Sequence, residues 1–329
     1  MLKQKLAFAF AAAMFATTSL ASATELKLAD FQPPTHFVVK NAYEPFAASV
    51  SEKTGGAVTV KVFMGGELGP GPAEQYSRAV DGVTDIAFGL PGYTASNFPK
   101  TLLTELPGVL SADTGTAQMI ANIDMLADEY RRVVLLGLWN NAPNIIFTAT
   151  KPIRSFEDLK GLKIRVPSRN AGLVVEAWGA SPVSMPAPEI YNALQTGVID
   201  GAMTDATTLG AFKLAEVTNY ITVGMDTTIS SFFLIMNRDS FEGLDEAQQQ
   251  VVVDAGREAA LNGNKAWLGI ADKALAGFAA TEGKEVITLA DAETAKFNAA
   301  SAAVVAKVVA DAEAQGIAAG AFVDALKSE

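Results

Sequence analysis

The sequence predicts an α/β protein of two similar lobes, on the strength of three observations. The chain has 329 residues, half of them apolar, with 27 glycines and 14 prolines, which is enough for a sizeable core and about two domains. Short apolar strands alternate with amphipathic helices along the chain, the pattern of α/β folds. One motif also occurs twice, which indicates that two halves of the chain fold alike.

The first 23 residues have the pattern of a secretory signal. Lys3 and Lys5 precede an apolar run over 6–20, and an A-x-A cleavage site occupies 21–23. A membrane anchor is the alternative, but a spanning helix needs about 20 apolar residues. We therefore expect cleavage after Ala23 and a periplasmic protein. The chain has no cysteine, so it needs no disulfide and is not a lipoprotein.

The charge of the chain disfavours a nucleic-acid partner. Removing the two lysines of the signal leaves 23 basic residues against 36 acidic ones, a formal charge of −13. Such a surface repels phosphate backbones. An anionic ligand would therefore need a local basic group. With one histidine and no cysteine, we expect no metal site and no cofactor.

The elements of the first lobe follow in order. Residues 25–29 and 57–63 alternate like strands, with an amphipathic helix over 37–52 between them and a Gly55-Gly56 turn.

Further along, apolar residues from 119 to 134 recur at helical spacing and lead into an apolar strand over 134–139. Residues 230–236 form a strand that crosses between lobes, and the chain from Leu244 onward is mainly helical. No low-complexity linker divides the chain. We expect one lobe from 24–143 and 232–272, and the other from 144–231 and 273–329.

The repeat is the motif E-x-Y-x5-G-V-x-D-x-A, which occupies 74–87 and again 189–202. Each copy predicts a helix that ends at the glycine and a short strand after it. Chance matching of small residues is the alternative, but the joint match of Glu, Tyr, Gly and Asp favours two similar lobes. Two such lobes place a ligand in the crevice between them, beyond the strand ends.

The segment KGLKIRVPSRNAG places a permanent charge, Arg165, in an apolar strand. Side-chain alternation turns Arg165 away from the apolar face, and Ser168 to Asn170 offer helix N-cap chemistry just beyond. Arginine beside a helix N-terminus is anion-binding chemistry, because a guanidinium gives a carboxylate two charge-assisted hydrogen bonds. A surface salt bridge with Glu157 or Asp158 is the alternative, and these residues alone do not decide between the two.

Other candidates for the cleft wall come from strand ends. Phe88 and Tyr93 follow the first repeat strand, and Thr204 and Asp205 follow the second, so the four should face one cleft.

Three more candidates lie on apolar strands. Trp139 and Asn141 could supply stacking and amide hydrogen bonds, although Trp139 could equally pack in the core of the hinge. Of Phe232 and Phe233, one ring should be core and the other, Phe232, could line the site.

The string over 159–201, with K-G-L-K-I-R-V-P at its start and A-L-Q-T-G-V-I-D-G at its end, closely resembles a family signature. The family is that of the DctP-type solute-binding proteins of TRAP (tripartite ATP-independent periplasmic) transporters. The strings PPTHF, TGGAVTVKVFMGGELG, DGVTDIAFG and ELPGV follow in the expected order, so the resemblance covers nearly the whole mature chain.

This resemblance implies a two-lobed periplasmic-binding-protein fold with a ligand cleft between lobes joined by crossing strands and a long helix. It implies that the cleft closes on a small organic acid and that Arg165 grips its carboxylate. It further implies delivery of the acid to the small and large membrane subunits of an ion-gradient-driven permease. His36 falls at the mouth of the cleft, where it either contacts ligand or is a solvated loop residue.

One departure from the family bears on the ligand. Sialic-acid receptors of the family carry a second arginine some twenty residues before the first, where this chain has Ile145 and Ile146, and the nearby Arg154 should face solvent. This favours a monocarboxylate, or an acid with an uncharged far end, over a dicarboxylate. Aromatic, hydroxy or oxo, sugar and dicarboxylic acids and sulfonates all remain open.

A periplasmic α/β enzyme acting on a small carboxylate is the alternative class. The chain lacks G-x-S-x-G, H-E-x-x-H and P-loop motifs, and two prolines spoil the only phosphate-loop imitation, over 66–74. Asp200 and Asp205 could form an acid-base pair, but the repeat makes Asp85 and Asp200 paired structural residues. We expect a monomeric receptor and no catalysis.

Overall fold

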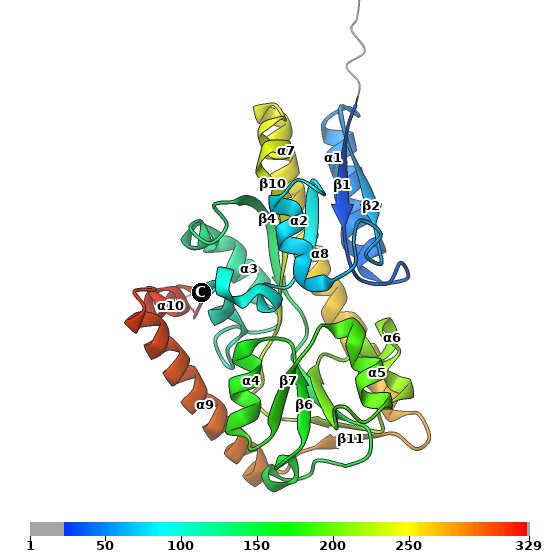
Figure 1. Cartoon of the computed structure of the whole chain (residues 1–329), viewed down its shortest axis with the longest axis vertical. Coiled ribbons are helices and arrows are strands. Elements are labelled where there is room, and N and C mark those ends of the chain that lie inside the picture. The colour runs from blue at the N-terminus through cyan, green and yellow to red at the C-terminus, as the bar shows by residue number, and fades with distance from the viewer. Residues whose placement is uncertain (1–22, 328–329) are drawn as a thin grey trace, which may run out of the picture.

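A computed structural model describes residues 23–327 and forms two α/β lobes that are joined by two strand connections and a long helix (Figure 1). The predicted fold class is therefore confirmed. The predicted secretory signal over 1–23 lies almost wholly outside the described residues. No helix within 23–327 is long and apolar enough to cross a membrane.

Lobe I contains a five-stranded sheet in the order β2-β1-β3-β10-β4. Its strands are β1 Thr24–Ala29, β2 Val58–Phe63, β3 Ile86–Gly89, β4 Val133–Asn140 and β10 Ser231–Asn237. Strand β1 is parallel to β2 and β3, whereas β10 is antiparallel to both of its neighbours.

Lobe II contains a six-stranded sheet in the order β11-β9-β5-β8-β6-β7. Its strands are β5 Ile145–Thr148, β6 Lys163–Val166, β7 Ser181–Ser184, β8 Gly201–Thr204, β9 Tyr220–Val223 and β11 Glu285–Thr288. Strand β5 is antiparallel to both of its neighbours. Each sheet thus has one strand that enters from the other lobe, β10 from β9 and β5 from β4, and that strand is the antiparallel one.

Residues 23–327 also form ten α-helices. They are α1 Glu44–Lys53, α2 Gln75–Val80, α3 Gly115–Ala121, α4 Arg169–Ala177, α5 Ile190–Gln195, α6 Thr208–Ala211, α7 Arg238–Glu242, α8 Glu246–Ala279, α9 Asp291–Ala314 and α10 Ala319–Lys327. Helix α8 has 34 residues and begins in a capping box formed by Asp245 and Gln248. Its first part packs in a lobe I core and its last part in a lobe II core, so it is the predicted long connecting helix.

The two C-terminal helices also connect the lobes. Helix α9 runs along the side of the molecule from lobe II, where Phe297 is buried, to lobe I, where Ala312 is buried (Figure 1). Helix α10 then packs with Phe322 and Leu326 in a lobe I core. The expectation that 273–329 belongs to lobe II therefore fails for its last third, because the apolar face of α10 is covered by lobe I.

The repeat folds in the same way in both lobes. Helices α2 and α5 are each followed by a glycine with positive φ, Gly82 at 69° and Gly197 at 73°, and then by β3 and β8. Asp85 and Asp200 each accept a backbone N–H of the neighbouring strand at 2.8 Å. The prediction that these two aspartates are paired structural residues is confirmed.

The helix predicted over 119–134 is only partly present. Helix α3 ends at Ala121, a 3₁₀ turn covers Ile123–Leu126, and β4 begins at Val133. The Asn122 side chain donates to the Gln118 carbonyl at 3.0 Å and competes with the helical pattern there. The apolar spacing correctly indicated burial, since Met119, Leu126 and Tyr130 are buried in a lobe I core, but most of the segment is not α-helical.

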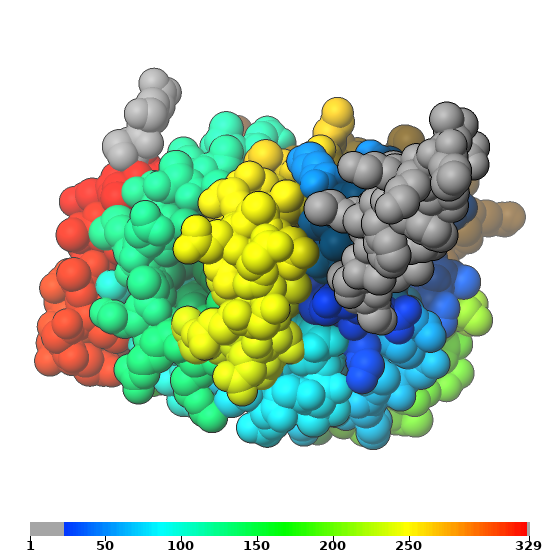
Figure 2. All heavy atoms as spheres, turned by 90° about the horizontal axis from the view of Figure 1, so that it is seen from above, coloured from blue at the N-terminus to red at the C-terminus, as the bar shows by residue number. Residues whose placement is uncertain are grey.

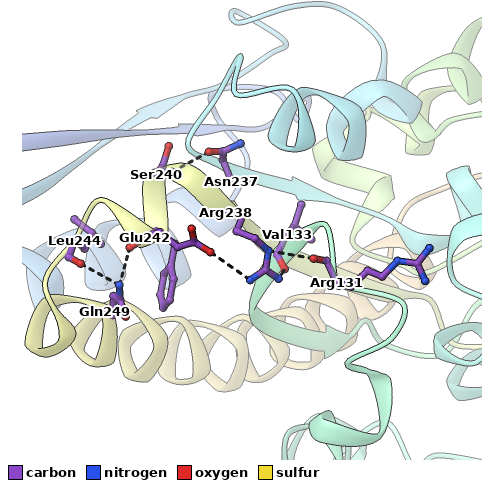
Figure 3. A network of polar contacts seen from close by, with 9 residues as sticks. Arg131, Val133, Asn237, Arg238, Ser240, Glu242, Leu244 and Gln249 are labelled. Atoms are coloured by element: carbon purple, nitrogen blue, oxygen red, sulfur yellow. Dashed lines mark hydrogen bonds and ion pairs between the residues drawn. The ribbon is translucent and has the colours of Figure 1, made fainter.

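The far end of the crossing strand β10 is fastened by a polar network (Figure 3). The Asn237 side chain caps α7 through Ser240 N at 2.9 Å, and Arg238 donates to the Arg131 and Val133 carbonyls at 3.1 and 3.0 Å. These bonds tie β10 to the beginning of β4. Seen from this end of the molecule, α7 and its surroundings (yellow) lie beside the segment that precedes β4 (green; Figure 2).

Candidate ligand-binding site

A small cavity of about 40 Å³ lies between the lobes. Lobe I contributes residues beyond the ends of β1 and β3, and lobe II contributes residues at or beyond the ends of β6 and β8. The cavity therefore lies where the repeat predicted a cleft.

Arg165 is the third residue of β6, and only 2% of it is exposed. Its Nε donates to the Met185 carbonyl at 2.9 Å, Nη1 to the Met203 carbonyl at 3.3 Å and Nη2 to the Tyr93 hydroxyl at 3.4 Å. These bonds use three of the five guanidinium N–H groups. None of the ion pairs among the described residues includes Arg165.

The predicted alternative, a surface salt bridge, is wrong. Glu157 pairs with Lys160, and Asp158 accepts hydrogen bonds from Ser155. Arg165 is instead buried beside the cavity, and this burial lowers the pKa of its guanidinium. Removing an unpaired charge from water is costly, so the structure holds Arg165 here against a substantial penalty.

Tyr93 reaches Arg165 from the other lobe. It lies in the 3₁₀ segment Pro91–Asn97 of lobe I, and its hydroxyl also accepts the Ala187 N–H of lobe II at 2.9 Å. Burial raises the pKa of the phenol, so Tyr93 keeps its O–H hydrogen at neutral pH. One hydroxyl thus joins the two lobes at the cavity wall.

Five aromatic side chains form a continuous wall, here called the aromatic belt. Successive ring centroids lie 6.1 Å apart for Tyr93 and Phe31, 5.8 Å for Phe31 and Phe88, 5.4 Å for Phe88 and Phe232, and 4.6 Å for Phe232 and Trp267. All five residues line the cavity. Arg165 contacts the Tyr93 end of the belt.

Asp205 lies near the Trp267 end. Its Oδ1 accepts the Thr207 N–H at 2.8 Å and the Thr207 hydroxyl at 2.5 Å, and its Oδ2 accepts the Asn141 amide at 2.9 Å. The carboxylate is buried without a cation within ion-pair distance among the described residues, and burial raises its pKa.

Asn141 connects this group to the hinge. Its Oδ1 accepts the Ser230 N–H at 2.7 Å, and the Asn144 amide donates to Thr228 and Ser230 hydroxyls at 3.0 and 3.2 Å. Residues 141–144 and 228–230 belong to the two strand connections between lobes. The same side chains therefore hold the connections together and line the cavity.

His36 is buried, so the interpretation as a solvated loop residue is wrong. Only 3% of it is exposed, its Nδ1 accepts the Val38 N–H at 3.2 Å, and its ring lies 5.3 Å from that of Trp267. Burial lowers the pKa of His36 to about 3, so the ring is neutral near neutral pH. It lines the cavity.

Most of the predicted residues meet at this cavity. They are Arg165, His36, Phe88, Tyr93, Asn141, Thr204, Asp205 and Phe232. Phe233 points into a lobe I core, as expected for one ring of that pair.

Two predicted site residues lie elsewhere. Trp139 is fully buried in a lobe I core between Phe88 and Phe232, because β4 directs it beneath the cavity wall. Ser168 caps α4 as predicted, accepting the Ala171 N–H at 3.2 Å, and this bond keeps its hydroxyl at the helix start.

No second arginine lines the cavity among the described residues. Ile145 and Ile146 lie in β5, and Arg154 pairs with Glu285 at 2.7 Å on the surface. The expected solvent-facing position of Arg154 is confirmed.

Several lining residues were missed by sequence reasoning. They are Phe31, Gln32, Asn144, Thr207, Thr208, Phe212, Ser230 and Trp267. Phe31 and Gln32 follow β1 just as Tyr93 follows β3, so the strand-end rule could have found them. Trp267 lies in the middle of a long helix, where no local pattern marks it.

Two lobes that enclose a cavity with one buried guanidinium, joined by a hinge of two strand connections, define a receptor that captures a ligand between its lobes. The chain belongs to the bacterial extracellular solute-binding proteins, family 7 (DctP), whose model matches residues 28–312.

Similar proteins agree with this assignment. The uncharacterized protein YiiZ of Salmonella typhimurium is 31% identical over 69% of this chain and 71% of its own. A TRAP solute-binding protein from an unidentified marine microbe, specific for aromatic acid ligands, has a TM-score of 0.85 at 28% identity and covers 92% of this chain and 97% of its own. A Bordetella bronchiseptica TRAP periplasmic protein with bound mandelate has a TM-score of 0.83 at 30% identity, with the same coverage.

The chain is thus a solute-binding protein of the TRAP type, a class of substrate-binding receptors and not of enzymes.

Proposed function

We propose that this receptor captures a small aromatic monocarboxylate and that Arg165 anchors the carboxylate. The observation that carries the proposal is a fully buried guanidinium, without an ion-pair partner among the described residues, at one end of an aromatic belt. Two structural neighbours support it, one specific for aromatic acid ligands and one with bound mandelate.

The chemistry of the anchor follows from its free donors. Two guanidinium N–H groups remain for a ligand carboxylate, and hydrogen bonds to a charged group contribute about 1.5 to 3 kcal/mol each. The Tyr93 O–H can donate to the same carboxylate. The belt accepts a planar ring through offset or edge contacts.

A ligand can favour closure of the lobes because the groups that bind it come from both lobes. Tyr93, Phe31 and Phe88 belong to lobe I, whereas Arg165 and Asp205 belong to lobe II. A ligand held by both sets binds the closed form better than the open one, and so shifts the population toward closure.

The remaining parts of the proposal concern delivery. The signal is removed after Ala23, the mature monomer binds its acid in the periplasm, and the closed receptor passes the acid to the small and large membrane subunits of the permease. Mass determination of the exported protein would test the cleavage site, and light scattering would test the monomer.

The decisive experiment compares Arg165→Ala with Lys163→Ala, which removes an exposed cation of the same strand. Calorimetry with benzoate, phenylacetate and mandelate should show a loss of roughly 100-fold or more for Arg165→Ala and little change for Lys163→Ala. Circular dichroism should show an intact apo fold for both variants. Near wild-type binding by Arg165→Ala would refute the anchor, and failure of the wild type to bind any of these aromatic acids would refute the ligand class.

A further inference from the structure

A donor without a partner lines the cavity at the Trp267 end of the aromatic belt. Trp267 is 2% exposed, and its indole N–H makes no hydrogen bond of normal geometry with any described residue. Burial raises the pKa of the Asp205 carboxyl, and the Trp267 N–H lies close enough to this carboxyl to oppose part of the rise. A buried N–H without a partner is uncommon and costly, which points to a group that the cavity is built to receive.

An acceptor lies beside this donor. An ionised carboxylate can accept about four hydrogen bonds, and Asp205 accepts three, two at Oδ1 and one at Oδ2. The Asn141 bond to Oδ2 fixes the carboxylate from the hinge side, and the two Thr207 bonds fix it from its own loop. The orientation of Asp205 is therefore set before any ligand arrives.

We propose that Asp205 and Trp267 together select a hydroxyl group on the ligand, which donates its hydrogen to Asp205 and accepts the Trp267 N–H. This inference rests on the proposed function, because it places the hydroxyl on the same aromatic acid that Arg165 anchors.

A hydroxyl satisfies both groups, because it carries one donor and two acceptor lone pairs. An ammonium donates but cannot accept, and a methoxy oxygen accepts but cannot donate. A second carboxylate would bring two negative charges together in a buried site. The acid selected here therefore has one carboxylate and a hydroxyl.

An acid without the hydroxyl leaves the Trp267 N–H and the fourth acceptor position of Asp205 without this partner. Sites built to hydrogen-bond a ligand hydroxyl discriminate strongly against analogues that lack it. We expect the best hydroxybenzoate isomer to bind roughly 10- to 100-fold more tightly than benzoate. The matching methoxybenzoate should bind no better than benzoate.

The experiment is calorimetric titration of the full mature chain with benzoate, the three hydroxybenzoates and the three methoxybenzoates. Trp267→Phe keeps a ring in the belt and removes the N–H, and Asp205→Asn keeps the shape and removes the carboxylate. Asp226→Asn is the matched control, because Asp226 is an exposed lobe II carboxylate near the hinge that does not line the cavity.

Both test variants should reduce the preference for the hydroxybenzoate over benzoate by roughly tenfold, and Asp226→Asn should keep the full preference. Equal wild-type affinity for benzoate and every hydroxybenzoate would overturn the hydroxyl subsite while leaving the Arg165 anchor intact. A preference that survives in both variants would also overturn it, and the wild-type comparison decides even if one variant fails to fold. Absence of binding by every acid would overturn the proposed function and this inference with it.

Discussion

Glu105 is a buried acid at the contact between the lobes. It is 1% exposed, its Oε2 has no hydrogen-bond partner among the described residues, and Ser168 of lobe II lies beside it. Burial raises its pKa from 4.5 to about 7, although hydrogen bonds from the Ser168 side chain and the Ser231 backbone oppose the rise. The folded protein therefore holds a proton here that the unfolded chain releases.

The pH dependence of stability follows from this shift. Because the folded pKa exceeds the unfolded one, Glu105 contributes stability below about pH 4.5 that is lost as the pH rises through about 7, up to about 3 kcal/mol. Glu105→Gln should remove this loss. Urea unfolding at about pH 5 and about pH 8 should show a smaller difference for the variant than for the wild type.

Other buried groups do not confuse this comparison. Asp30, with its pKa raised to about 6 mainly by burial, acts in the same direction, and His36, with its pKa lowered to about 3, acts in the opposite one. Both are present in the wild type and the variant, so their effects cancel. An unchanged pH difference in Glu105→Gln would contradict the assignment.

Prediction from sequence succeeds at single residues where strand geometry fixes direction. Alternation placed Arg165 off the apolar face of β6, and strand ends placed Phe88, Thr204 and Asp205 at the cavity. Alternation also predicts on which face of β4 Trp139 lies, but it does not predict which face is buried in the core. That depends on which side of the sheet α8 covers, and no local sequence pattern shows it. The burial of His36 likewise depends on Trp267, more than 200 residues away.

Helix α8 packs unusually close to strand β4. A Cβ at Gly256 would lie 2.7 Å from both the Cβ and the carbonyl oxygen of Leu136, so only glycine fits this crossing. Gly269, on the same helix, has no atom within 4 Å of its Cβ position. The two glycines offer a matched pair with the same helix and opposite surroundings.

Alanine at these positions should act with opposite sign. Gly256→Ala should destabilise the protein by about 1 to 3 kcal/mol, because it pushes α8 away from β4. Gly269→Ala should stabilise it by up to about 1 kcal/mol, because alanine favours the helix. Thermal unfolding of both variants checks this, and equal effects of the same sign would show that helix propensity alone decides.

Elements were predictable where a local chemical signal marks their ends. The glycines after α2 and α5 and the Ser168 cap of α4 gave correct boundaries. The segment 119–134 lacked such a signal, and apolar spacing alone could not distinguish one long helix from a short helix followed by a 3₁₀ turn.

At the scale of the whole molecule, the relation between the lobes was only partly predictable. The crossing strand β10 was predicted from its apolar run, whereas the long connecting helix was implied by the family resemblance. The return of α10 to lobe I was not predicted, because its apolar face could have packed against either lobe. Helices α8 and α9 both extend across the hinge, so closure must bend or slide two helices as well as two strand connections.

The Tyr93 hydroxyl forms hydrogen bonds between the two lobes, and removing it tests how much these bonds stabilise the closed form. The hydroxyl joins lobe I to Arg165 and to the Ala187 N–H of lobe II, at 3.4 and 2.9 Å. Tyr93→Phe removes both bonds, keeps the ring in the aromatic belt and leaves the partly buried Ala187 N–H without this partner. The closed form should lose more than the open form, because the open form exposes the same groups to water.

Tyr93→Phe should therefore weaken acid binding by roughly three- to tenfold and lower the closed population at a given acid concentration. Tyr191→Phe is the control, since Tyr191 is bonded at 2.8 Å to Glu216 of its own lobe, on the surface. Calorimetry gives the affinity, and small-angle scattering with increasing acid gives the closed fraction. If Tyr93→Phe closes at the same acid concentration as Tyr191→Phe, the hydroxyl does not hold the lobes together, and closure depends on Arg165 and the hinge alone.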